Sequence, residues 1–209
     1  MLEGLKPCKV MKFFEEISKI PRKSGEEDKV VEYLKKFALE RNLEYYRDNY
    51  RNIVIKKEAS QGKENSPAIA LQAHTDMICE KSPESNHDFS IDGLELYVDG
   101  DFIKAKGTTL GADNGIGVAI ILAVLDCENI KAPKLECIFT SEEETTMLGA
   151  INLDLANIES NRIISLDNIE KYSILYSLNN GDIKIKDIDK INLASGTLSE
   201  EGYYDEENE

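Results

Sequence analysis

Acidic side chains and one histidine follow the apolar segments of this chain, at the points where predicted strands end. The members of this set are His74, Asp76, Glu142, Glu143, Glu144 and Asp167, with Asp113 in a glycine-rich segment between them. An imidazole together with several carboxylates is typical of a hydrolytic zinc or manganese site. Carboxylates that lie close together resist joint ionisation, and a divalent cation removes that cost. The residue types therefore predict a metal centre built mainly from carboxylates.

Three adjacent glutamates, 142–144, could supply both a metal ligand and a proton acceptor to such a centre. Two metal ions about 3.5 to 4 Å apart need a bridging carboxylate and can hold and deprotonate a water between them. A further carboxylate, not bound to metal, must then accept the proton of that water. One of the glutamates can bind metal while its neighbour, on the other side of the backbone, faces the water.

Two amphipathic helices are predicted near the N-terminus, because apolar residues recur at helical spacing over 10–20 and again over 24–42. Ser24 and Glu27 have the spacing of a capping box, which predicts that the second helix begins there. Short strands are expected over 45–46 and 52–56, and hairpin strands within 88–106.

Strands and helices then alternate along the chain. The predicted order is a strand over 68–73, a buried helix over 116–125, a strand over 134–140, a short helix over 148–156 and a strand over 162–167. This order favours an α/β fold in which a mixed sheet carries helices on both faces. Because ligand sites in such sheets lie at the carboxyl ends of the strands, the fold should bring the acidic set and His74 together.

Two regions are expected along the chain. Residues 1–190 are expected to form the N-terminal part of the domain that carries the candidate metal site, with strand-like runs over 173–178 and 182–188 at its end. Residues 191–209 are acidic and are predicted to be a disordered tail.

The excess of acidic over basic residues limits the binding partners that we expect for this chain. The 209 residues include 25 Lys and Arg against 40 Asp and Glu, a formal net charge of -15. An acidic surface repels phosphate backbones and anionic lipids, so neither nucleic acid nor a membrane surface is an expected partner. Because the chain has no apolar run of spanning length, no signal-peptide core and no C-x-x-C pair, we expect it in the cytoplasm.

Several other site types lack their motifs. Gly115 and Gly117 are followed by Ile120 where a dinucleotide-binding fingerprint needs Gly or Ala, and neither G-K-[ST] nor G-x-S-x-G occurs. Each candidate also has a structural interpretation by itself: a polar cap at His74, a solvated helix start at 142–144, or a helix N-cap at Asp113. His87 is expected in an exposed polar loop.

Four segments of the sequence resemble the M20 di-zinc peptidases, and within them the aminoacyl-histidine dipeptidases, also called Xaa-His or cytosol non-specific dipeptidases. The matching segments are 71–81 (LQAHTDMICEK), 86–117 (beginning NHDFSIDG and ending GADNGIG), 142–150 (EEETTMLGA) and 165–167. The resemblance implies a zinc-peptidase catalytic domain that hydrolyses dipeptides. It implies two Zn²⁺ ions in a complete site, with Mn²⁺ or Co²⁺ as alternatives.

The resemblance also implies a role for each candidate residue. His74 and Asp167 would bind one metal, Asp113 would bridge the two metals, and Glu144 would bind the other. Asp76 would orient His74, and Glu143 would be the general base. The peptide bond after Asp113 would be cis. A register shifted by one residue, with Glu142 as the base and Glu143 as the ligand, is the alternative.

The chain departs from the family in ways that bear on activity. Thr146 stands where the family usually has Gly, and 168–180 lacks the usual acidic run and small-residue strand. The lid domain and the final segment with the second metal's histidine are not matched, so we expect an incomplete, N-terminal part of the enzyme that is a poor dipeptidase alone. The alternative is a non-catalytic relic that binds at most one metal or associates with a full-length partner; self-association into a homo-oligomer is also expected at the open sheet edge.

Overall fold

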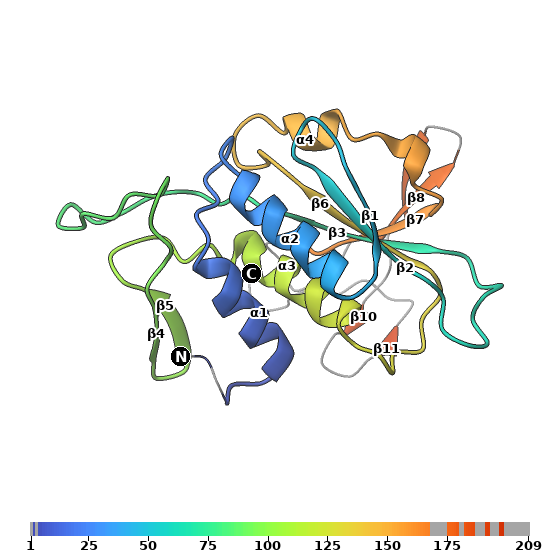
Figure 1. Cartoon of the computed structure of the whole chain (residues 1–209), viewed down its shortest axis with the longest axis horizontal. Coiled ribbons are helices and arrows are strands. Elements are labelled where there is room, and N and C mark those ends of the chain that lie inside the picture. Colours follow the sequence, from blue (N-terminus) through green and yellow to red (C-terminus); the bar gives the residue numbers. More distant parts are fainter. Residues whose placement is uncertain are drawn as a thin grey trace, which may run out of the picture.

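A computed structural model describes residues 2 and 4–167 of the chain (Figure 1). Beyond them it describes only the backbone of strands β8 (Leu175–Asn179), β9 (Asp182–Lys186), β10 (Ile191–Asn192) and β11 (Thr197–Leu198). β8 and β9 overlap the strands predicted over 173–178 and 182–188. The domain boundary at residue 190 and the disorder of 191–209 stay predictions, because they concern residues outside the described part.

A seven-stranded mixed sheet forms the centre, in the order β1-β2-β6-β3-β7-β8-β9. Its first five strands are β1 (Glu44–Arg47), β2 (Ile53–Lys57), β6 (Leu135–Thr140), β3 (Ile69–His74) and β7 (Arg162–Ser165). β3 lies between β6 and β7 and is parallel to both, whereas the strands on either side are antiparallel. The carboxyl ends of the three central strands therefore meet at one edge.

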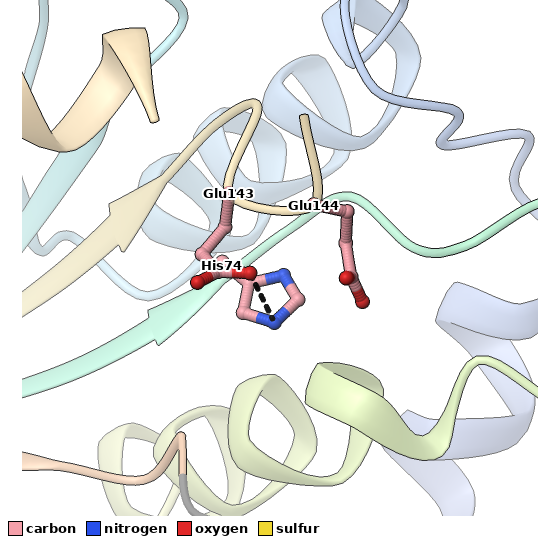
Figure 2. A group of neighbouring side chains, drawn as sticks. All are labelled: His74, Glu143 and Glu144. Carbon is pink, nitrogen blue, oxygen red and sulfur yellow. Dashed lines mark ion pairs between the residues drawn. The ribbon is translucent and has the colours of Figure 1, made fainter. Parts of the chain in front are cut away.

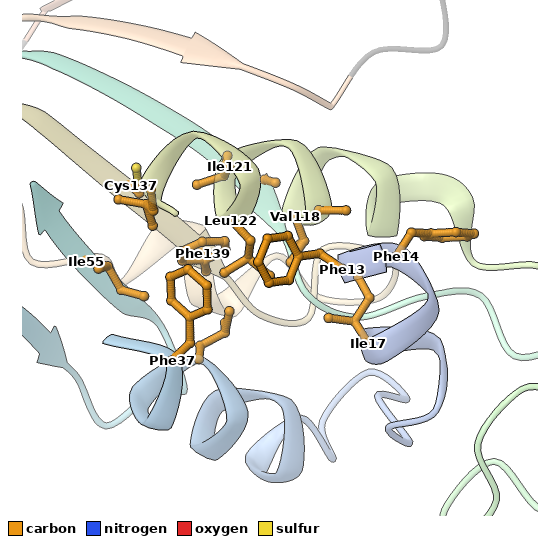
Figure 3. Close-up of a cluster of buried hydrophobic side chains, with 14 of the residues drawn as sticks. Phe13, Phe14, Ile17, Phe37, Ile55, Val118, Ile121, Leu122, Cys137 and Phe139 are labelled. Atoms are coloured by element: carbon orange, nitrogen blue, oxygen red, sulfur yellow. The ribbon is translucent and has the colours of Figure 1, made fainter. Parts of the chain in front are cut away.

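Three helices cover one face of this sheet: α1 (Cys8–Ser18), α2 (Asp28–Glu40) and α3 (Ala112–Leu125). Figure 3 shows Phe13 of α1, Leu122 of α3 and Phe139 of β6 in the shared core, and each is at most 2% exposed. α3 is apolar on almost all sides, and it is therefore buried between α1 and the sheet. Each such side chain contributes about 1.5 to 3 kcal/mol through burial.

The opposite face is covered by the segment that carries α4 (Leu148–Ile151) and the 3-10 helix η1 (Leu155–Asn157) (Figure 1). Leu153 and Ile158 of this segment pack against Val54 and Ile138 of the sheet. The predicted α/β fold, with a mixed sheet and helices on both faces, is therefore confirmed. Among residues 4–167 the two layers are unequal, because the helices on the second face, α4 and η1, are short turns.

The capping box predicted at Ser24 is wrong. α2 begins at Asp28, its N-cap is Glu27, and neither side chain caps the helix. The Ser24 hydroxyl instead donates to Oδ2 of Asp76, at 2.7 Å, and Glu27 accepts the backbone N–H of Gly25. Ser24 thus bonds to a carboxylate that is distant in sequence, and Glu27 bonds to a local turn, so neither side chain caps the helix.

Other predicted elements are shorter than expected. Only β4 (Leu96–Asp99) and β5 (Phe102–Ala105) of the predicted hairpin region are strands. Residues before them turn instead, where Asp92 and Asp88 exchange hydrogen bonds. The helix predicted over 148–156 is interrupted, because the Asp154 side chain caps η1. None of the helices within the described residues combines the length and the apolar character that a membrane span requires.

Candidate metal centre

The sheet register brings the predicted residues to one edge. His74, the last residue of β3, pairs with Thr140, the last residue of β6, and Gln72 pairs with Ser165 on β7. The loop after β6 carries Glu143 and Glu144, and Figure 2 shows their carboxylates beside the imidazole at the end of β3. Parallel strands that end together present their following loops to the same space.

His74 is at the centre of this space. Its Nε2 lies 3.2 Å from Oδ1 of Asp113, 3.8 Å from Oδ1 of Asp167 and 3.8 Å from Oε2 of Glu143. Ligand atoms of His74, Asp113 and Asp167 lie within 4.8 Å of one another, and so do those of His74, Glu143 and Glu144. One nitrogen and several oxygens so close together could hold a divalent metal ion.

The other ring nitrogen of His74 faces Asp76. Nδ1 lies 3.3 Å from Oδ1 of Asp76, so Nε2 is the nitrogen directed at the cluster. The ring is 1% exposed. Burial acts to lower the pKa of His74, but Asp76 and the charges of Asp167 and Glu143 outweigh it and raise that pKa to about 9. A metal ion would take the place of this proton.

Asp76 is itself fixed by four contacts. Besides His74 and the Ser24 hydroxyl, its carboxylate accepts the backbone N–H groups of Glu143 and Glu144, each at 3.1 Å. Burial acts to raise the pKa of Asp76, yet these hydrogen bonds and His74 lower it overall. Asp76 therefore stays ionised and holds both the imidazole and the glutamate loop.

Glu143, Glu144 and Asp167 resist joint ionisation. Burial, followed by repulsion from the neighbouring acids, raises the pKa of Glu143, Glu144 and Asp167, and His74 compensates only in part. A divalent cation would stabilise all of them in the charged form. The donor set and its electrostatics thus fit a divalent metal.

Glu142 points away from the cluster. Its carboxylate accepts hydrogen bonds from Nη1 of Arg51, at 3.2 Å, and from the hydroxyl of Thr146, at 2.7 Å. Its backbone N–H donates to the buried carboxylate of Glu27, and its φ is 54°. This arrangement favours the register in which Glu143 and Glu144 face the site.

Asp113 reaches the cluster from the kinked start of α3. Residues 113 and 114 have non-helical backbone angles, and the N-cap is Gly111, so Asp113 is not the helix cap that its sequence context allowed. The Asp113–Asn114 peptide bond is cis, as the resemblance implied. The Asp113 side chain is 64% exposed and so is open to a ligand.

His87 does not join this cluster. It stacks edge-on against Phe89, with ring centroids 4.5 Å apart, in the loop before the hairpin. The four cysteines are free thiols and belong to neither group of candidate ligands. Sequence reasoning missed the buried Arg22 and assigned Glu27 to a helix cap; both contact the loops of the site from the segment between α1 and α2.

Comparison with known proteins agrees with the resemblance seen in the sequence. No family model matches the chain. The cytosol non-specific dipeptidase of Escherichia coli is 40% identical over 173 residues, which are 83% of this chain and 36% of that protein. The crystal structure of the aminoacylhistidine dipeptidase of Vibrio alginolyticus has a TM-score of 0.79 at 38% identity, over 82% of this chain and 35% of that one.

A tripeptidase structure from Staphylococcus aureus shares the fold, with a TM-score of 0.65 at 22% identity. Of the Escherichia coli and Vibrio alginolyticus dipeptidases, this chain spans about one third of the length. The resemblance is confirmed, and this chain is a relative of the cytosol non-specific and aminoacyl-histidine dipeptidases over most of its own length.

Proposed function

We propose that this site serves metal-dependent hydrolysis of dipeptides, of the Xaa-His type or with broader specificity. The observation that carries the proposal is the convergence of His74 with carboxylates from three loops at one sheet edge. The names of the Escherichia coli and Vibrio alginolyticus relatives support the substrate class. The acidic charge and the cytosolic relative support a location in the cytoplasm.

Each residue has a separate role in this proposal. His74 and Asp167 would hold one metal ion, Glu144 would hold a second, and Asp113 would be a ligand of both. Bound metal ions of this kind polarise a carbonyl and lower the pKa of a bound water. Glu143 would be the general base that takes a proton from the attacking water and returns it to the leaving amine. Asp76 keeps the imidazole of His74 turned toward the site.

Zinc is the proposed metal, since imidazole and carboxylate ligands suit it, with Mn²⁺ or Co²⁺ as alternatives. The two metal positions are unequal. The chain has two histidines, and the second, His87, is not in the cluster. Within residues 4–167 the second position therefore has Glu144 and Asp113, with no imidazole of its own, and we expect one ion to bind much more tightly than the other.

The test combines metal binding with hydrolysis. The purified chain is titrated with Zn²⁺, Mn²⁺ or Co²⁺, and release of histidine from β-alanyl-histidine is followed beside a dipeptide without histidine. We expect tight binding of a single ion and slow, metal-dependent hydrolysis that Glu143→Gln abolishes while metal binding persists. Glu142→Gln is the matched control and should retain both properties.

Two results would separate the possible failures. Metal binding without any hydrolysis would favour the alternative, a non-catalytic relative that binds one metal. If no divalent ion binds, or if Glu142→Gln and Glu143→Gln have equal effects, the assignment of these roles is wrong.

A further inference from the structure

Arg22 is a buried cation that contacts two of the segments forming the candidate site. It lies between α1 and α2 and is 2% exposed. Its Nη1 donates to the backbone carbonyls of Thr75, at 3.2 Å, and Asp76, at 3.0 Å. Its Nη2 donates to the carbonyl of Gly111. The first two carbonyls directly follow His74 in sequence, and the third precedes Asp113 by two residues.

The glycines on either side of Asp113 leave the space that this guanidinium occupies. A Cβ at Gly111 would collide with Nη2 of Arg22 and would lie 2.6 Å from Sδ of Met77. A Cβ at Gly115 would lie 2.9 Å from the same Nη2. Such distances are too short for a real side chain, so the loop around Asp113 is fitted to the arginine.

Arg22 also places a positive charge close to the acidic cluster. Burial lowers its pKa to about 10, against the opposing effect of Asp76, Asp113 and Glu144, so it is charged at neutral pH. This charge would by itself repel a bound metal ion. Its hydrogen bonds would instead favour metal binding, because they fix the segments that carry the ligands. The two effects have opposite signs and can be told apart.

We propose that Arg22 is a positioning residue that preforms the metal site by holding the segments of His74 and Asp113 at a fixed separation. This inference rests on the metal site proposed above. A planar guanidinium suits the task because its donors form a rigid fork, whereas a lysine ammonium is a point charge on a flexible stem. Arg22→Lys therefore preserves the charge and removes the geometry.

The experiment measures the Zn²⁺ affinity of the metal-free chain by competition with a chromophoric chelator. It compares wild type with Arg22→Lys and Arg22→Met. Arg41→Met is the matched control, since Arg41 makes an ion pair with Asp126, at 2.7 Å, away from the cluster. We expect about 10- to 100-fold weaker binding in both Arg22 variants and no change in the control. The absorption spectrum of bound Co²⁺ should also change in Arg22→Lys, which reports altered ligand geometry. Thermal unfolding of each metal-free variant is recorded beside these measurements.

Each other outcome would overturn the inference. Wild-type affinity in Arg22→Lys would show that the hydrogen-bonded fork is unnecessary, and tighter binding in Arg22→Met would show that only charge repulsion operates. If both variants fail to fold without metal, Arg22 is a determinant of the fold and not of the site. If the wild-type chain binds no zinc, both the proposed metal site and this inference are wrong. The other outcomes concern Arg22 and leave the proposed function unaffected.

Discussion

Asp76 and Glu143 are joined by a hydrogen bond in which the Asp76 carboxylate accepts the Glu143 backbone N–H at 3.1 Å. The accepting oxygen, Oδ1, also lies 3.3 Å from the ring of His74. One buried carboxylate therefore sets both the orientation of the imidazole and the position of the loop opposite it. The loops after β3 and β6 are coupled through this atom.

Asp76→Asn should weaken this coupling. The amide can accept through one atom only, and its NH₂ group would face backbone N–H donors, which costs about 1 to 3 kcal/mol of stability. We expect Zn²⁺ affinity to fall about 10- to 100-fold. Calorimetric titration with zinc and urea unfolding measure the two effects. Asp154→Asn, which alters a comparable backbone acceptor at η1, should leave zinc affinity unchanged. Equal zinc affinities in wild type and Asp76→Asn would contradict the coupling.

Glu136 should make stability depend on acid pH. This fully buried side chain accepts the backbone N–H groups of Glu159 and Ser160 and lies 3.2 Å from Nζ of Lys56. Burial acts to raise its pKa, but these partners lower it overall. Because the folded pKa lies below the unfolded one, the stabilisation is complete above about pH 4.5 and is lost as the pH falls through the folded pKa.

The matching variant is Glu136→Gln, which should cost about 2 kcal/mol at neutral pH. Urea unfolding of both proteins from pH 7 downward measures the difference, which should shrink below about pH 4.5. A difference that stays constant into the acid range would mean that the ionised form is not the stabilising one.

Gly111→Ala should be more destabilising than its backbone angle alone requires. Gly111 has φ of 62° and Gly62 has φ of 82°, so alanine is strained at both and costs about 1 to 2 kcal/mol. Only Gly111 also has Arg22 and Met77 in the space of a Cβ, which should add about 1 to 3 kcal/mol. Thermal unfolding of Gly111→Ala and Gly62→Ala compares them. Similar losses would show that the loop can move away from Arg22.

Lys57→Met should destabilise the end of α3. The Lys57 ammonium donates to the carbonyls of Leu125, the last residue of α3, at 2.7 Å, and of Cys127, just beyond the helix, at 2.6 Å. The last carbonyls of a helix have no partner within the helix and carry its negative dipole end. Methionine keeps the apolar stem, so the expected loss of about 2 kcal/mol reports the hydrogen bonds and the charge. Lys35→Met removes an exposed helix pair and should cost at most about 0.5 kcal/mol. Urea midpoints that fall equally in the two variants would rule out this role.

Local sequence patterns determined the elements and the edge where the site lies. The apolar runs before His74 and Asp167 predicted β3 and β7, and an uninterrupted apolar stretch predicted the buried part of α3. These predictions succeed because the spacing of apolar side chains indicates the type of element that can pack them against the rest of the fold. The position of polar residues after such runs is equally local, so the candidate ligands could be named from the sequence.

Only the tertiary structure decided which partner each polar side chain takes. Ser24 has the spacing of a helix cap, yet its hydroxyl donates to Asp76, 52 residues away. Glu142 and Glu143 are adjacent and of the same residue type. The contact with Arg51 directs Glu142 away from the cluster, whereas Glu143 faces it. Arg22 is buried against carbonyls of two distant loops. A hydrogen-bonding group has several possible partners of similar strength, and the fold selects among them by which it brings within reach.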